Sequence, residues 1–241
     1  MRRAFALGYG IVAYLGFVGV FVALADFVAQ QGLLRGIDEG TRVAWAAALA
    51  VDLALLALFG ISHSLLARPW CKRLWRWAIP TVLERSTYVL VANLALALVV
   101  WQWRPMPQAV WHVDVPAARA TLWGIHLLGV VILVVATFQT DHFDLFGLRQ
   151  VWLHARGRRY TPVPFQERGL YRRMRHPMMA GMLLWMWSAP TMSVGRLAFA
   201  AAMSGYIAIG IVLEERDLTR TLGAPYQAYR RRVRAVIPLR R

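Results

Sequence analysis

The chain has 241 residues, of which 59% are hydrophobic, and it contains 11 tryptophans. This apolar content exceeds what a soluble domain needs and is typical of a helical integral membrane protein. The formal net charge of +16 could indicate a nucleic-acid-binding protein. However, the basic residues lie between apolar runs, where lipid headgroups and membrane topology account for them. We therefore expect a lipid bilayer as the partner and no nucleic acid.

Six apolar runs follow one another along the chain and predict an all-α, polytopic helical membrane protein with about six transmembrane segments. They cover residues 4–29, 43–66, 88–103, 120–138, 178–189 and 197–213. A membrane span needs roughly 20 apolar residues, so the third and fifth runs reach that length only with their polar flanks. The last two runs predict a C-terminal helical hairpin.

Lysine and arginine are distributed asymmetrically between the ends of these runs. Most of the 28 basic residues lie at the N-terminus, in the loops after the second and fourth runs, and in the C-terminal tail. The opposite side would receive only Arg35, Arg42, Arg104, Arg119 and Arg196. Because cytosolic loops carry an excess of Lys and Arg, this pattern predicts that both termini face the cytosol.

Under this topology, ionisable and hydroxyl side chains gather at the cytosolic ends of the predicted helices. They occur at residues 62–64, 84–88, 141–144, 175–176 and 214–215. Charges at membrane depth are costly unless they are paired or functional. Each cluster alone has a structural interpretation, such as an ion pair or a headgroup contact. Their convergence on one face predicts a functional site.

The sequence Asp141-His142-Phe143-Asp144 follows the fourth apolar run. It is typical of a histidine that a carboxylate holds as an acid–base pair. A metal site is the alternative, and it would need further ligands from His63, His154 or His176. The spacing matches no common metal motif, so we predict no metal.

After the sixth run, Tyr226, Tyr229, Val233 and Val236 recur at helical spacing. They predict an amphipathic C-terminal helix on the cytosolic membrane surface, and Pro225 suits its first turn. Two interpretations stay open. The helix is either a plain interfacial helix or a lid that packs its tyrosines against a bound ligand.

Several motifs occur in a fixed order in the C-terminal third. R-H-P-x-x-x-G at residues 175–181 precedes the E-E pair at 214–215, L-G-x-x-Y-x-x-Y at 222–229 and V-x-x-x-x-P at 233–238. This set resembles the isoprenylcysteine carboxyl methyltransferase superfamily, which includes membrane enzymes that use S-adenosylmethionine. Other segments resemble one branch of it, the bacterial methanethiol S-methyltransferases. These segments are residues 84–90, 101–105, 141–152 and 213–218.

The chain departs from the superfamily pattern at one position of the R-H-P motif. Met179 stands where the motif usually has tyrosine, so the hydroxyl or ring that tyrosine offers the cofactor is absent. Methionine can still pack against an adenine ring. The change removes no charged group, and the assignment stands.

The resemblance implies methyl transfer from S-adenosylmethionine to a small thiol, methanethiol, giving dimethyl sulfide near the cytosolic face of a bacterial inner membrane. It implies one membrane domain over residues 1–241, with a four-helix N-terminal part (1–140) and a cofactor-binding C-terminal part (141–241). Two alternatives are a methyltransferase of the same fold acting on a lipid or prenylcysteine carboxylate, and a non-enzymatic membrane assembly or transport protein. The sequence predicts no particular oligomeric state.

The candidate residues form two groups under this assignment. His142, oriented by Asp141 or Asp144, is expected to act as the base that deprotonates the thiol, with Arg85 and Tyr88 near the thiol. The second group is expected to bind the cofactor and consists of Arg175, His176, Pro177, Gly181, Glu214, Glu215, Tyr226 and Tyr229.

Overall fold

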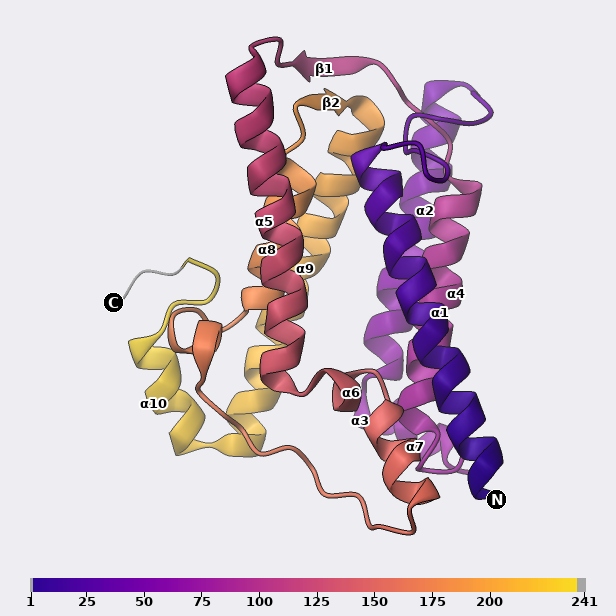
Figure 1. The fold of residues 1–241 in the computed structure, drawn as a ribbon, viewed down its shortest axis with the longest axis vertical. Helices are drawn as coiled ribbons and strands as arrows, with labels where there is room; N and C mark the ends of the chain where they lie inside the picture. Colours follow the sequence, from indigo (N-terminus) through magenta and orange to yellow (C-terminus); the bar gives the residue numbers. More distant parts are fainter. Residues whose placement is uncertain (1, 238–241) are drawn as a thin grey trace. The chain divides into compact units, whose positions relative to one another are not determined.

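The structure is a computed structural model that describes residues 2–237, and these residues are mostly helical (Figure 1). In chain order the elements are α1 (Arg3–Ala29), α2 (Trp45–Leu66), α3 (Pro69–Trp75), α4 (Glu84–Gln102), β1 (Ala109–His112), α5 (Pro116–Thr140), α6 (His142–Leu145), α7 (Leu148–Ala155), the 3-10 helix η1 (Gly169–Arg172), α8 (Pro177–Trp187), β2 (Thr191–Ser193), α9 (Val194–Leu222) and α10 (Ala224–Arg232). The short strands β1 and β2 pair antiparallel.

Five helices are long and apolar enough to cross a membrane, namely α1, α2, α4, α5 and α9. The prediction of an all-α, polytopic integral membrane protein is therefore confirmed. The predicted fifth run forms α8, which has only 11 residues. At 1.5 Å per residue it is about 16 Å long, roughly half of a typical hydrocarbon core.

The chain divides into two compact units. Unit 1 comprises residues 1–108 and 141–163, and unit 2 comprises residues 109–140 and 164–241. In unit 1, α4 packs against both α1 and α2, and α7 packs against α1. In unit 2, α5 packs along α8, and α9 contacts α8 and α10. This division differs from the boundary expected after residue 140, because α5 packs with the C-terminal helices.

Polar contacts connect the elements of unit 1. The Asn93 amide of α4 donates to the Ala13 carbonyl of α1 at 3.0 Å. Asp52 of α2 is fully buried and accepts the backbone N–H of Arg104 at 2.8 Å. The Arg35 guanidinium donates to the carbonyls of Trp101 and Trp103. Arg35 thus satisfies carbonyls at the end of α4 that have no partner inside the helix.

In unit 2, two glycines let α5 and α8 approach closely. A Cβ atom added at Gly181 of α8 would lie 2.6 Å from the Gly129 carbonyl oxygen and 2.7 Å from the Leu133 nitrogen. Small residues at such crossings are a common feature of membrane helix pairs. Gly181, one of the residues expected to bind the cofactor, therefore lies at a close crossing of α5 and α8.

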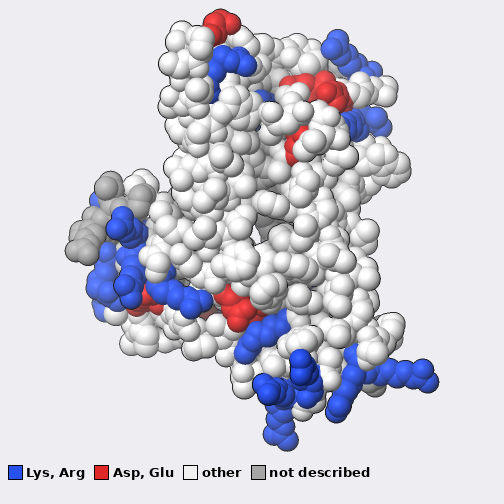
Figure 2. Space-filling model, viewed as in Figure 1, with Lys and Arg blue, Asp and Glu red and all other residues white. Residues whose placement is uncertain are grey.

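The charged residues lie at the ends of the long helices (Figure 2). In unit 2, Lys and Arg gather over α10, which carries Arg230, Arg231 and Arg232 in its last turn. In unit 1 they gather at the end that carries α3 and α7. The sides of the long helices are mostly uncharged, as expected for surfaces that face lipid.

Candidate active site

The Arg-His-Pro stretch before α8 is held by the chain that follows α10. The backbone N–H of Arg175 donates to the Arg234 carbonyl, and that of His176 donates to the Ala235 carbonyl, both at 2.9 Å. Met174 and Arg234 form a parallel bridge next to these bonds. Pro177 then occupies the first turn of α8, where its missing N–H costs nothing. We call this backbone pairing of residues 174–176 with 234–235 the C-terminal clasp.

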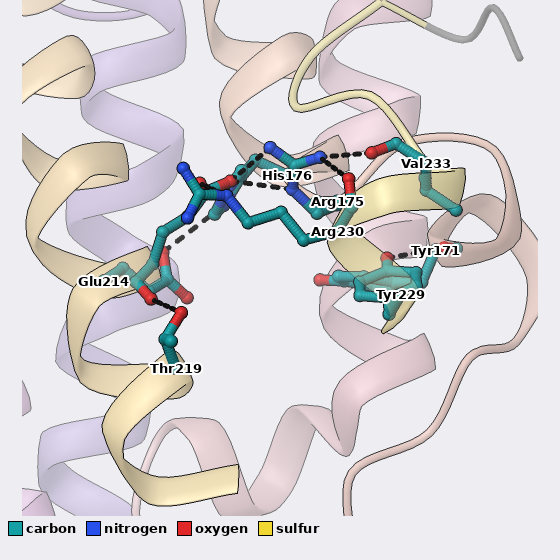
Figure 3. Close-up of polar contacts among 9 residues, drawn as sticks. Tyr171, Arg175, His176, Glu214, Thr219, Tyr229, Arg230 and Val233 are labelled. Atoms are coloured by element: carbon teal, nitrogen blue, oxygen red, sulfur yellow. Dashed lines mark hydrogen bonds and ion pairs between the residues drawn. The ribbon is translucent and has the colours of Figure 1, made fainter. Parts of the chain in front are cut away.

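A buried ion pair lies beside the C-terminal clasp (Figure 3). Glu215 Oε1 accepts from Arg175 Nε at 2.7 Å and lies 2.6 Å from Arg175 Nη2. Its other oxygen lies 3.0 Å from Arg230 Nε. Arg175 also donates to the carbonyls of Arg230 and Val233. Both Glu215 oxygens are thus bound to protein cations, and the pair links α9 to α10 and to the start of α8.

His176 lies between the two consecutive glutamates of α9. Its Nε2 is 3.2 Å from Glu215 Oε1, and its Nδ1 is 3.4 Å from Glu214 Oε2. The two carboxylates differ in exposure, since the side chain of Glu214 is 48% exposed and that of Glu215 only 9%. Glu214 is therefore the carboxylate of this pair that has room for a ligand.

The tyrosines predicted to cover a ligand are buried in α10. Tyr226 and Tyr229 form a core with Val233, and Tyr229 donates to the Tyr171 carbonyl at 2.6 Å. The Tyr226 hydroxyl is buried and has no hydrogen-bond partner among residues 2–237. Burial raises the pKa of Tyr226 to about 12 and also raises the pKa of Tyr229. Both phenols therefore stay protonated at neutral pH, and Tyr226 retains a donor for a ligand.

In unit 1, the carboxylates of the D-H-x-D sequence contact Arg149 and the start of α6. Asp141 has a φ of 85° and caps α6 by accepting the Asp144 N–H at 3.1 Å. Asp144 Oδ1 accepts from Arg149 Nη1 at 2.9 Å, and Asp141 Oδ2 lies 3.7 Å from Arg149 Nε. Within residues 2–237, no group of three or more His, Cys, Asp or Glu side chains could hold a metal ion.

Arg85 of α4 contacts the end of α6, and Tyr88 of α4 contacts Arg85 and His63. Arg85 Nε donates to the Leu145 carbonyl at 2.6 Å, and its guanidinium carbon lies 4.9 Å from the centre of the Tyr88 ring. The Tyr88 hydroxyl is 2.7 Å from His63 Nε2. Gly147 permits this approach, because a Cβ atom there would lie 2.7 Å from the Ser86 nitrogen.

Sequence reasoning missed the residue that contacts His142. The hydroxyl of Tyr14 in α1 lies 2.9 Å from His142 Nε2, although 128 positions separate the two residues. His142 is 8% exposed, and this burial lowers its pKa, partly offset by the charge of Asp141. The signal in the sequence that could have indicated this contact is the hydroxyl of Tyr14, which lies within the long apolar run of residues 4–29.

The described residues thus form a helical integral membrane protein with two polar clusters, one at the end of unit 2 around Glu215 and one in unit 1 around His142. The chain belongs to the NnrU protein family, whose profile matches residues 51–225.

Relatives of known name cover almost the whole chain. The chain is 42% identical over 238 residues to methanethiol S-methyltransferase of Mycobacterium tuberculosis, covering 99% of this chain and 98% of the relative. It is 43% identical over 236 residues to methanethiol S-methyltransferase 2 of Bradyrhizobium diazoefficiens, covering 98% and 91%. It is 40% identical over 238 residues to methanethiol S-methyltransferase of Crocosphaera subtropica, covering 99% and 93%. No solved structure matches. The predicted resemblance to methanethiol S-methyltransferases is confirmed.

Proposed function

We propose that this chain is a methanethiol S-methyltransferase that uses S-adenosylmethionine and releases dimethyl sulfide. The observation that carries the proposal is the 42% identity, over 99% of the chain, to a relative of that name. The names of the relatives favour a small thiol over a lipid or prenylcysteine carboxylate. They also favour an enzyme over an assembly or transport protein.

We assign the methyl donor to the cluster of unit 2. S-adenosylmethionine supplies a methyl group on a sulfonium centre, together with ribose hydroxyls and an ammonium group that suit a carboxylate acceptor. Glu214, half exposed beside His176, fits such a partner. The Tyr226 hydroxyl, which has no partner within residues 2–237, fits an acceptor atom of the donor.

The remaining donor-side residues act by fixing the walls of this site. Arg175 and Glu215 hold each other in a buried pair, and Tyr229 anchors α10 to Tyr171. Pro177 starts α8, and Gly181 lets α8 approach α5.

We assign the thiol to the cluster of unit 1. A thiolate is the nucleophile in methyl transfer to sulfur, and an ordinary thiol is mostly protonated at neutral pH. Burial lowers the pKa of His142, so its imidazole is neutral near pH 7 and can accept the thiol proton. Asp141 opposes part of this shift. Arg85 contributes positive charge, and Asp144 holds Arg149. General base catalysis of this kind contributes about 10²- to 10⁴-fold in rate.

The direct test is to incubate the purified protein with S-adenosylmethionine and methanethiol. We expect dimethyl sulfide in the headspace and an equal amount of S-adenosylhomocysteine in solution. A prenylated cysteine offered as competing acceptor should yield no methyl ester. If the wild-type protein forms neither product from methanethiol, or methylates only the prenylcysteine, the proposed function is wrong.

Each residue assignment has its own measurement. His142→Ala should lower turnover at least about 100-fold while calorimetry shows the wild-type affinity for S-adenosylmethionine. Glu214→Ala and His176→Ala should weaken that affinity. Native turnover by His142→Ala, or unchanged affinity in the other two variants, would remove the corresponding assignment.

We also propose that the protein lies in a bacterial inner membrane with both termini in the cytosol. The support is the positive-inside pattern of its Lys and Arg residues. Alkaline phosphatase fused to the C-terminus should be inactive, since it folds only after export, and a fluorescent protein fused there should fold. An active phosphatase fusion together with an unfolded fluorescent protein would place the C-terminus outside the cytosol.

A further inference from the structure

Aromatic rings from α1, from α6 and from Phe146 directly after α6 surround His142 in unit 1. The Tyr14 ring meets the imidazole edge-on with ring centres 5.7 Å apart. Phe146 lies at 4.8 Å and Phe17 at 6.2 Å from the imidazole centre, and these two phenylalanines stack on each other at 3.7 Å. Phe143 contacts both His142 and Tyr14. We call Tyr14, Phe17, Phe143 and Phe146 the aromatic cluster.

Polar side chains near His142 lie at distinct positions. The Tyr14 hydroxyl, from α1, is 2.9 Å from Nε2. Asp141, directly before α6, is the charged group that acts on the imidazole. Asp144 of α6 is bound to Arg149 of α7. The aromatic cluster therefore surrounds the imidazole, and Tyr14 brings a hydroxyl to its Nε2.

We propose that Tyr14 is a positioning residue for His142 in thiol deprotonation. This inference rests on the proposed function and extends it with a residue that supports the base. Neutral imidazole has one donor and one acceptor nitrogen, whereas imidazolium has two donors. The Tyr14 oxygen can accept the Nε2 proton of the imidazolium, so its hydroxyl fixes the ring and stabilises the protonated product of the transfer.

The proposed step couples deprotonation of the thiol to methyl transfer. The S–H bond of the thiol breaks and its proton moves to His142. The sulfur lone pair forms a bond to the donated methyl carbon while the carbon–sulfur bond of the donor breaks. The products are a neutral thioether and S-adenosylhomocysteine, and the His142 imidazolium returns its proton to water.

The test compares two tyrosine-to-phenylalanine substitutions on the same helix. Tyr14→Phe removes the hydroxyl that contacts His142. Tyr9→Phe is the matched control, since Tyr9 is also half-buried on α1 and its hydroxyl bonds the Thr87 side chain at 3.0 Å. We expect Tyr14→Phe to lower kcat with methanethiol by about tenfold, and Tyr9→Phe to stay within about twofold of wild type.

A thiol of low pKa separates a role in deprotonation from a merely structural one. With 2,2,2-trifluoroethanethiol, which ionises far more readily, Tyr14→Phe should lose less than about twofold, because less help from a base is needed. Substituting Tyr14 in a His142→Ala background should cost nothing further, because the two residues act together. Equal losses with both thiols, or a full additional loss in that background, would overturn the proposal.

A second readout needs no turnover. The ¹⁵N imidazole signal of His142, identified by its absence in His142→Ala, can be titrated in detergent-solubilised protein. Tyr14→Phe removes an acceptor for the imidazolium, so the midpoint should fall by about half a pH unit or more, whereas Tyr9→Phe should not move it. The acid limb of the pH–rate profile should shift in the same direction.

An unchanged midpoint in Tyr14→Phe would refute the coupling even if activity fell. If the wild-type protein methylates no thiol while the Tyr14→Phe midpoint still shifts, the proposed function fails but the contact between Tyr14 and His142 stands. If methanethiol is methylated equally well by wild type and Tyr14→Phe, the proposed function stands and this inference fails.

Discussion

Replacing Glu215 with glutamine should loosen the C-terminal clasp. The carboxylate binds Arg175 at 2.7 and 2.6 Å and Arg230 at 3.0 Å, and Arg175 is 8% exposed. Glutamine keeps the volume but removes the charge, and so leaves a buried guanidinium without a counter-ion. Removing one partner of a buried pair costs about 3–5 kcal/mol. We take about 3 kcal/mol, the lower end of that range, because the Arg230 and Val233 carbonyls still accept from Arg175.

Amide hydrogen exchange measures this loss of stability directly at the C-terminal clasp. The amides of Arg175 and His176 donate across the C-terminal clasp, so they exchange when it opens. A loss of about 3 kcal/mol corresponds to roughly 100- to 200-fold faster exchange at these amides, since every 1.4 kcal/mol is tenfold.

The control for this experiment is the neighbouring carboxylate. Glu214→Gln removes a charge whose side chain is 48% exposed, and it should change exchange by less than about threefold, since exposed pairs contribute little. If Glu215→Gln also stayed within about threefold of wild type, the buried pair would not be what holds the clasp.

Three further outcomes follow from the packing of unit 2. Gly181→Ala should cost about 1–3 kcal/mol by overpacking the α5–α8 crossing, seen as a lower thermal midpoint. Gly205→Ala on α9, where an added Cβ meets no atom within 4 Å, should not lower it. Tyr226→Phe should leave the thermal midpoint unchanged, because the Tyr226 hydroxyl has no partner within residues 2–237. It should weaken S-adenosylmethionine binding measured by calorimetry, and unchanged binding would exclude Tyr226 from the donor site. Tyr229→Phe loses the hydrogen bond to the Tyr171 carbonyl and should lower the free energy of unfolding by about 1 kcal/mol. The thermal midpoint should fall accordingly, and a midpoint equal to that of wild type would show that this bond does not stabilise the protein.

The sequence predicted the helices well, because long apolar runs leave the backbone few alternatives in a membrane. It was less accurate at their ends. The run from residue 178 to 189 gave a helix that stops at Trp187, since Pro190 disfavours helical backbone in the residue before it. The run from 197 to 213 gave a helix that continues to Leu222. Its charged last turns carry Glu214 and Glu215, so the hydropathy boundary fell short of the helix end.

The candidate site was predictable from the sequence where its residues are neighbours in the chain. It was not predictable where tertiary packing selects their partners. Glu214 and Glu215 are the same residue type at consecutive positions. A helix, however, rotates successive side chains by about 100° around its axis. One carboxylate therefore faces the buried Arg175 and the other remains half exposed. The contact between Tyr14 and His142 spans 128 positions, and no local spacing rule reaches that far.

The different positions of the two glutamates determine how variants of this site should be interpreted. A Glu215 variant disturbs Arg175, His176 and the C-terminal clasp together, so its loss of activity would not by itself place Glu215 at the methyl donor. The Glu214 carboxylate lies 3.4 Å from His176 and its side chain is 48% exposed, which leaves room for a ligand. A loss of donor affinity in a Glu214 variant with unchanged exchange at the clasp therefore points to direct binding. The comparison of these adjacent carboxylates separates binding from stability more cleanly than any single substitution in the motif.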